Sequence, residues 1–261
     1  MNAKTRDFLN FLLWSSEALL HPSFQNLSGA YEERAYGNGL RQQIFRLERQ
    51  GLLERDASVP NDRLYRLTAA GRLQALGGRD PEERWARGWD GQWRIVLFDV
   101  PSSQNAQRER LRRYLRERNF GCLQNSVWIS PDPLAEQRET LAGGKVSVKS
   151  LVMLESRTIG GESDAEIAAA AWDFDEVNRR YARHLKVLDE RPLSGLRTES
   201  GTKAFHRWVA TEREAWQDAM TRDPLLPKRL LPADYAGQRS WRRRVEVLQQ
   251  AVRHLRVAGV E

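Results

Sequence analysis

The sequence predicts an α+β protein made of three successive units. Three observations lead to this prediction: helix-spaced apolar residues followed by two strand-like runs near the N-terminus, alternating strand and helix patterns in the middle, and long amphipathic stretches towards the C-terminus. The 261 residues are enough for two or three compact domains. We expect these domains at residues 1–78, 88–160 and 161–261.

The composition is that of a folded protein with a basic charge balance. Hydrophobic residues make up 40% of the chain and charged residues 30%, and long apolar runs are missing, so we expect neither a disordered chain nor a transmembrane helix. The single cysteine, Cys122, rules out an intrachain disulfide, and we expect a cytoplasmic protein. The net charge of +7 is spread along the chain, so charge alone is weak evidence for a nucleic-acid partner.

Three helices are predicted in the first unit. Apolar residues three and four positions apart indicate a buried helix at residues 8–20, and a capping serine favours a short helix at residues 28–36. Asn38 is a suitable N-cap for a third helix over residues 40–49, and Gly51 supplies the left-handed residue that ends it.

Two short strands and a further helix complete the first unit. Residues 52–55 and 63–67 have strand composition, and the linker between them contains Pro60 and Asn61, which predicts a hairpin. Thr68 then begins another helix. Three helices followed by a hairpin is the element order of a winged helix-turn-helix, so this unit is predicted to bind DNA.

The third helix has an apolar face and a polar face. Leu40, Ile44 and Leu47 form the apolar stripe. On the other face, arginine can bind guanine and glutamine can bind adenine, while arginines at the helix end and on the hairpin would contact phosphates or the minor groove. The candidate contacts to double-stranded DNA are Asn38, Arg41, Gln42, Gln43, Arg46, Arg49, Arg63 and Arg66. The alternative is a small helical domain whose solvated face carries these residues.

The second unit has the pattern of a ferredoxin-like βαββαβ domain. Its predicted strands are residues 93–100, 122–124, 127–130 and 146–154, and its predicted helices are residues 104–118 and 133–141. The first of these helices is rich in arginine. Two interpretations stay open for it: a solvated surface paired with Glu109 and Glu117, or a contact with DNA.

The third unit is predicted to be helical, with helices at residues 164–188, 203–220 and 239–255. Residues 223–237, between the last two helices, contain three prolines. Because proline disrupts a helix interior, this segment is predicted to be a rigid, non-helical crossing.

Two stretches are specific enough to compare with a known family. One runs from WDGQWR at 89–94 through LFDVP at 97–101 to LQNSVWI at 123–129, and the other runs from DPLLP at 223–227 to LPADYAG at 231–237. Both resemble PaaX-type repressors, and the resemblance extends over nearly the whole chain. It implies a homodimer that binds the operator DNA of a catabolic operon and is released by a small effector such as an acyl-coenzyme A.

Some residues are candidates for binding that effector. Aromatic side chains at a domain junction would line an acyl pocket, and arginines would hold the phosphates of coenzyme A. The candidates are Trp89, Trp93, Trp128, Arg242 and Arg243. The alternative is that the tryptophans are packing anchors and the arginines belong to a solvated helix surface.

Asp99 is the residue that argues for catalysis. The middle unit is also similar to the small ferredoxin-like CRISPR-associated protein, in which an aspartate at the end of the first strand is proposed to hold a divalent metal. Two such carboxylates in a dimer would support phosphodiester hydrolysis, whereas the alternative is a turn residue before Pro101.

The remaining potentially reactive or metal-binding residues match no known catalytic or metal-binding motif. The histidines lack metal-ligand spacing, and neither a Gly-rich phosphate loop nor a nucleophilic serine motif is present. We therefore expect a regulator without enzymatic activity, metal or cofactor. Its rivals are a metal-dependent nuclease built on the middle unit and a protein-interaction scaffold with a vestigial winged helix.

Overall fold

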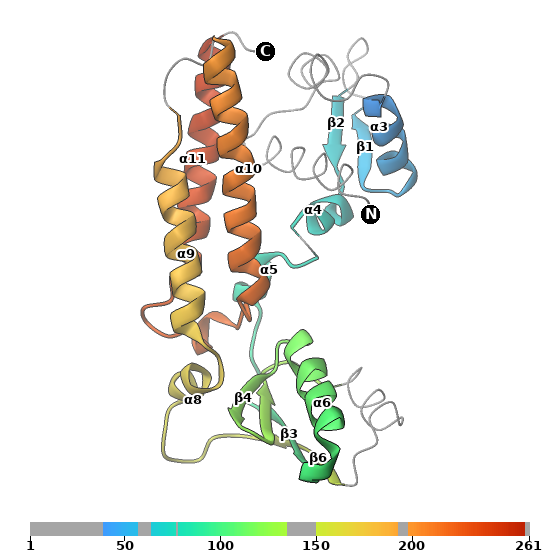
Figure 1. Ribbon diagram of the computed structural model, residues 1–261, viewed down its shortest axis with the longest axis vertical. Helices are drawn as coiled ribbons and strands as arrows, with labels where there is room; N and C mark the ends of the chain where they lie inside the picture. Colours follow the sequence, from blue (N-terminus) through green and yellow to red (C-terminus); the bar gives the residue numbers. More distant parts are fainter. Residues whose placement is uncertain (1–38, 57–63, 77, 135–149, 193–197, 259–261) are drawn as a thin grey trace. The chain divides into compact units, whose positions relative to one another are not determined.

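The computed structural model describes most of the chain after the first 38 residues (Figure 1). The described residues are 39–56, 64–76, 78–134, 150–192 and 198–258. The helices predicted at residues 8–20, 28–36 and 133–141 lie outside this part. None of the helices within it has both the length and the apolar character needed to cross a lipid bilayer.

The chain folds into two compact units, each built from separate stretches of sequence. The terminal unit contains Met1–Asp80, Arg179–Thr221 and Ala236–Glu261. The sheet unit contains Pro81–Asn178 and Arg222–Tyr235. The proline-rich crossing therefore belongs to the sheet unit, where it contacts α8, although it lies far from the strands in the sequence. The division into three sequence domains stays a prediction.

The N-terminal part of the terminal unit is a helix, a hairpin and a second helix. Its elements are α3 (Gly39–Arg49), β1 (Leu53–Asp56), β2 (Leu64–Leu67) and α4 (Ala69–Ala75). The two strands are antiparallel, with Leu53 opposite Leu67. Gly51 has φ +66° and ends α3 as predicted, because a residue with a Cβ is disfavoured there.

The turn after α3 is fastened to the start of α4. Thr68 caps α4 by accepting a hydrogen bond from the Gly71 N–H (3.0 Å), and its hydroxyl donates to the Gly51 carbonyl oxygen (2.6 Å). A Cβ added at Gly71 would lie 1.9 Å from the Leu52 carbonyl oxygen, so only glycine permits this close approach.

The sheet unit contains a four-stranded antiparallel sheet, which confirms the predicted α+β class. Its elements are α5 (Pro81–Ala86), β3 (Trp93–Asp99), α6 (Asn105–Glu117), β4 (Gly121–Gln124), β5 (Val127–Ser130), β6 (Ser150–Ser156) and α8 (Asp164–Ala171). The strand order is β4-β5-β3-β6, as expected for a split βαβ sheet. Two short 3₁₀ turns, Ser102–Gln104 and Lys228–Leu230, complete the unit.

One face of this sheet forms a core with α6. The core side chains include Val96 and Phe98 from β3, Leu111 and Leu115 from α6, and Trp128 from β5. They alternate with residues of the opposite face, as the two-residue period of a strand requires. Helix α8 packs against β4 at the edge of the sheet.

The long helix predicted over residues 164–188 is two helices, so that prediction is wrong. α8 ends at Ala171, the following Trp172 has an extended backbone, and α9 (Phe174–Asp189) begins immediately after Asp173. The Asp173 carboxylate accepts the Glu176 N–H (2.9 Å), and the Trp172 indole donates to the Asn119 carbonyl oxygen (3.2 Å). These contacts replace helix continuation and fix a corner.

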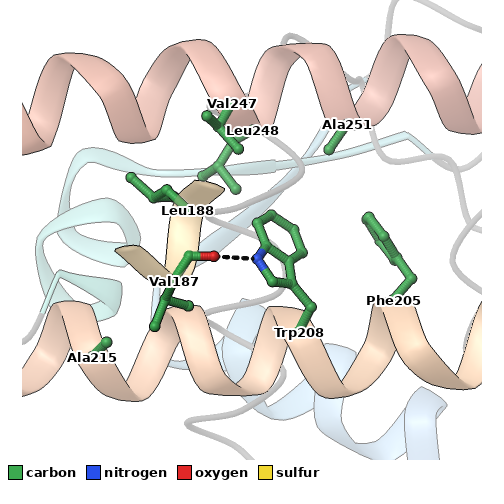
Figure 2. Packing of buried hydrophobic residues seen from close by; sticks show 8 residues of the cluster. All are labelled: Val187, Leu188, Phe205, Trp208, Ala215, Val247, Leu248 and Ala251. Carbon is green, nitrogen blue, oxygen red and sulfur yellow. Dashed lines mark hydrogen bonds between the residues drawn. The ribbon is translucent and has the colours of Figure 1, made fainter. Parts of the chain in front are cut away.

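The C-terminal part of the terminal unit is a bundle of long helices. α9 runs beside α10 (Glu199–Arg222) and α11 (Gly237–Ala258) (Figure 1). Figure 2 shows the core between them, where Trp208 of α10 donates its indole N–H to the Val187 carbonyl oxygen of α9 (2.8 Å). Val247, Leu248 and Ala251 of α11 close this core.

Candidate nucleic-acid interface

Helix α3 has a buried face and an exposed face. Ile44 and Leu47 are almost fully buried, as the apolar stripe predicted. Gln42, Arg46 and Arg49 are exposed. The separation follows from the helical period of 3.6 residues, which places residues three and four apart on one side.

The exposed face of α3 is a shallow hollow with donor side chains around it. Gln42, Phe45, Arg46, Arg49 and Gln50 line the hollow. The Arg49 guanidinium lies 5.9 Å from the centre of the Phe45 ring. Within the described ranges, Gln42 and Arg46 have no side-chain hydrogen bond or ion pair. These donors are therefore available for an external acceptor.

The predicted DNA contacts are only partly covered by the described side chains. Gln42, Arg46 and Arg49 lie together on α3. Arg41 and Gln43 belong to α3, and Arg66 lies opposite Glu54 in the hairpin, but the side chains of these three residues are outside the described part. Asn38 and Arg63 are outside it altogether. The set as a whole stays a prediction.

Sequence reasoning missed Phe45, whose side chain is 60% exposed. It follows the core residue Ile44 and therefore points about 100° away from it around the helix. An aromatic residue off the apolar stripe was the available signal, since core aromatics are expected on the stripe.

The candidate effector tryptophans do not form a single cluster. The Trp89 and Trp93 rings are 5.2 Å apart, and their indole N–H groups donate to the Gln92 carbonyl oxygen and the Asp164 carboxylate (3.0 Å each). Trp128 instead lies in the core beneath α6. This arrangement is that of packing residues, although Trp89 keeps a half-buried surface on which Arg229 lies at 5.4 Å.

The candidate effector arginines lie on α11, in the other compact unit. Arg243 is ion-paired with Asp189 (3.1 Å) and lies 3.7 Å from Glu246. Arg242 is exposed, and its Nε donates to the Gln238 carbonyl oxygen of the preceding turn (3.4 Å). Of these two arginines, Arg242 has the more accessible charge.

Asp99 is exposed at the end of β3, opposite Ser150 of β6. Within the described segments, no group of three or more histidine, cysteine, aspartate or glutamate side chains is arranged to hold a metal ion. A metal at Asp99 would therefore need ligands from another source, such as a second copy of the chain.

A buried polar network lies inside the helix bundle. Glu212 of α10 accepts hydrogen bonds from Arg244 Nε (2.7 Å) and His184 Nε2 (3.0 Å), while His184 Nδ1 contacts the Ser240 hydroxyl (2.7 Å). Glu212 is 1% exposed and Arg244 4% exposed. Arg244 also lies over the Trp216 ring, 5.2 Å from its centre.

Burial and the neighbouring charges together determine the protonation states of His184 and Glu212. Burial lowers the pKa of His184 and keeps the ring neutral, against the opposing influence of Glu212. Burial by itself would raise the pKa of Glu212, but Arg244 and His184 together hold that pKa below its usual value. Because the Glu212 carboxylate only accepts, His184 carries its proton on Nε2 and Nδ1 accepts from Ser240.

Serine, histidine and glutamate in this order resemble a hydrolase triad. The Ser240 hydroxyl cannot meet a substrate, however, because Ser240 and His184 have no exposed surface. The arrangement is a structural connection between α9, α10 and α11.

Comparisons with known proteins identify the class. The profile of the PaaX protein central Cas2-like domain matches residues 86–168, and that of the PaaX-like protein C-terminal domain matches residues 172–259. The chain is 26% identical over 213 residues to the transcriptional repressor PaaX of Escherichia coli (strain K12). This match covers 76% of the chain and 64% of the relative, slightly less than two thirds of its length.

A solved structure shares the fold. Uncharacterized protein Rv0674 from Mycobacterium tuberculosis superposes with a TM-score of 0.51 at 23% identity, covering 94% of this chain and 96% of that one. The two matched profiles and the repressor relative all carry the PaaX name. The chain belongs to the PaaX family, which confirms the resemblance seen in its two motif stretches.

Proposed function

We propose that this protein is a sequence-specific DNA-binding regulator that represses a catabolic operon and has no enzymatic activity. We further propose that residues 1–78 form a winged helix-turn-helix and that α3 is its recognition helix. The observation that carries the proposal is the exposed face of α3, where Gln42, Arg46 and Arg49 lack carboxylate partners among the described residues. The hairpin β1–β2 follows α3 in the chain, as a wing does.

The side chains of α3 suit the edges of base pairs in a major groove. Arg46 would donate two hydrogen bonds to guanine O6 and N7, and Gln42 would pair with adenine N6 and N7. Arg49, at the C-terminal end of α3, would contact phosphate and fix the position of the helix. Specificity then comes from the first two residues and affinity from all three.

We propose that the protein binds its operator as a homodimer. The sheet face opposite α6 supports this, because Ile95 and Leu97 of β3 lie beside Leu154 and Val152 of β6 on it. Val152 is 48% exposed and Leu154 45% exposed. An apolar sheet face of this kind is costly in water and would be covered by the same face of a second copy.

A small effector, such as an acyl-coenzyme A, would release the dimer from DNA. Effector binding would favour a dimer whose two recognition helices are wrongly spaced for the half-sites. Arg242 would be the first of the α11 arginines to contact phosphates, since Arg243 is already paired with Asp189. Such a regulator would act in the cytoplasm, where the chromosome lies.

The direct test is selection of bound sequences from a random duplex pool with the full-length chain, followed by footprinting. We expect one palindromic site, protected at two half-sites, with affinity that falls steeply as salt is raised. Candidate acyl-coenzyme A thioesters should remove the footprint. If no duplex is retained even at low salt, the proposal is wrong.

Two further measurements separate the rival functions and test the dimer. A nuclease would cut the selected duplex in Mg²⁺, and Asp99→Ala would abolish cleavage while leaving binding intact. Sedimentation of the wild type and of Leu154→Glu tests the dimer, since a carboxylate on that sheet face should leave a monomer. A Leu154→Glu protein that stays dimeric would place the dimer contact elsewhere.

A further inference from the structure

Phe45 is an exposed aromatic residue on the helix proposed to enter the groove. It is 60% exposed, and among the described large apolar residues with such exposure (Phe45, Leu73, Val152, Leu154 and Ile159) it is the only aromatic one. A phenyl ring left in water adds no hydrophobic stabilisation to the fold. It does not stabilise α3 either, because phenylalanine has a low helix propensity. Among the described residues only the Arg49 guanidinium lies over the ring, so the ring keeps an open apolar surface for a partner.

The residues around the Phe45 ring indicate which kind of partner it could contact. Gln42 and Arg49 lie three positions before and four positions after Phe45, and Arg46 is next to it, so donors flank the ring along the hollow of α3. A matching surface must combine hydrogen-bond acceptors with an apolar group. In the major groove thymine offers both, because its O4 accepts and its C5-methyl group is apolar.

We propose that Phe45 reads the C5-methyl group of a thymine next to the bases bound by Gln42 and Arg46. This inference rests on the proposed function and adds the apolar part of the recognition. A phosphate backbone would leave the ring without an apolar partner, and the minor groove carries no methyl group. In this assignment Phe45 contributes to sequence specificity, while Arg49 fixes the position of α3 on the DNA.

The test uses full-length protein and the duplex that it selects. Each thymine of the site is replaced in turn by deoxyuridine, which removes the methyl group and preserves the Watson–Crick pair. For the wild type, removal at the contacted position should weaken binding about fourfold, the value expected for one buried methyl. For Phe45→Ala the ratio of thymine to deoxyuridine affinity should fall to about one, and Phe45→Leu should keep part of it.

Controls distinguish this inference from its alternatives. Ile159→Ala, at a fully exposed isoleucine of the sheet unit, should keep the wild-type ratio. Phe45→Ala should keep the wild-type melting temperature and sedimentation coefficient. A Phe45→Ala protein that still prefers thymine overturns the assignment while leaving the DNA-binding function intact. A change in its sedimentation instead would place Phe45 in a contact between copies of the chain. If the wild type binds no duplex, the proposed function fails, and the assignment fails with it.

Discussion

Helices α3 and α11 both carry arginines close together in the sequence, yet the structure uses them differently. On α11, Arg244 is buried against Glu212 and Arg243 is ion-paired with Asp189. On α3, Arg46 is exposed without a hydrogen-bond or ion-pair partner among the described residues, and the Arg49 guanidinium lies over the Phe45 ring at 5.9 Å. The comparison teaches that the partner supplied by the fold, and not the density of arginines, indicates a binding surface.

The largest expected effect is on stability, and it tests the buried arginine of α11. Glu212→Ala should lower the free energy of unfolding by about 3–5 kcal/mol, because it leaves the Arg244 charge buried and unpaired. Glu214→Ala, at an exposed position of the same helix, is the matched control and should change it by less than about 0.5 kcal/mol. Urea unfolding curves measure both, and equal effects would remove the distinction between the two environments.

For the exposed arginine of α3, we expect a substitution to weaken DNA binding without lowering the stability of the protein. Arg46→Ala should weaken binding to the selected duplex by about 1–3 kcal/mol and relax specificity at one base pair. The melting temperature should stay unchanged because the exposed Arg46 side chain makes no hydrogen bond or ion pair with a described residue. Arg239→Ala, at an exposed arginine of α11, is the control and should leave the affinity unaltered. The comparison fails if the two variants bind equally.

Acidity should destabilise the helix bundle through His184. Burial lowers the pKa of His184, so below about pH 6.5 the unfolded chain takes up a proton that the folded chain refuses. Stability contributed by the neutral ring is therefore present at pH 7.5 and is lost as the pH falls, with a slope of up to about 1.4 kcal/mol per unit.

Urea unfolding at pH 7.5, 6.5 and 5.5 measures this slope in the wild type and in His184→Asn. The difference between the two curves removes the titrating groups far from this network and leaves the contribution of His184, including its effect on the pKa of Glu212. Parallel curves would show that the ring is not held neutral.

The smallest effect concerns the surface pair of α11. Arg243→Ala should change the free energy of unfolding by less than about 1 kcal/mol, because Arg243 is partly exposed, Asp189 is exposed, and water screens their attraction. Thermal or urea unfolding checks this, with Arg242→Ala as the neighbouring control. If Arg243→Ala lowered the free energy of unfolding as much as Glu212→Ala, solvent exposure would not determine how much these ion pairs stabilise the protein.

Local signals in the sequence were enough to predict several elements. Gly51 ends α3 with a positive φ, and Thr68 caps α4, because both positions obey rules that involve only a few neighbouring residues. The strands and helix of the sheet unit likewise follow from their periodicity. The break between α8 and α9 was missed because only the Asp173 cap is a local signal, whereas the Trp172 contact is made with Asn119, which is distant in the sequence.

The candidate site was less predictable than the fold. A helical wheel separates Ile44 and Leu47 from Arg46, but it cannot tell which arginines will find a carboxylate elsewhere in the chain. Arg244 is set apart from Arg242 and Arg243 by its place on the apolar stripe of α11, but its partner Glu212 belongs to another helix and could not be identified from the sequence. The exposure of Phe45 depends in the same way on what the remaining fold leaves uncovered.

The close approach at Gly71 has a mechanical consequence. Thr68 and Gly71 bind the start of α4 to the backbone of Gly51 and Leu52, directly after α3. Helices α3 and α4 are therefore joined by direct backbone contacts at Gly71 and Thr68, and we expect them to move together. If α3 binds DNA as proposed, a displacement of α4 would therefore be passed to the exposed side chains of α3. A bulky residue at 71 would separate the two helices while leaving each of them folded.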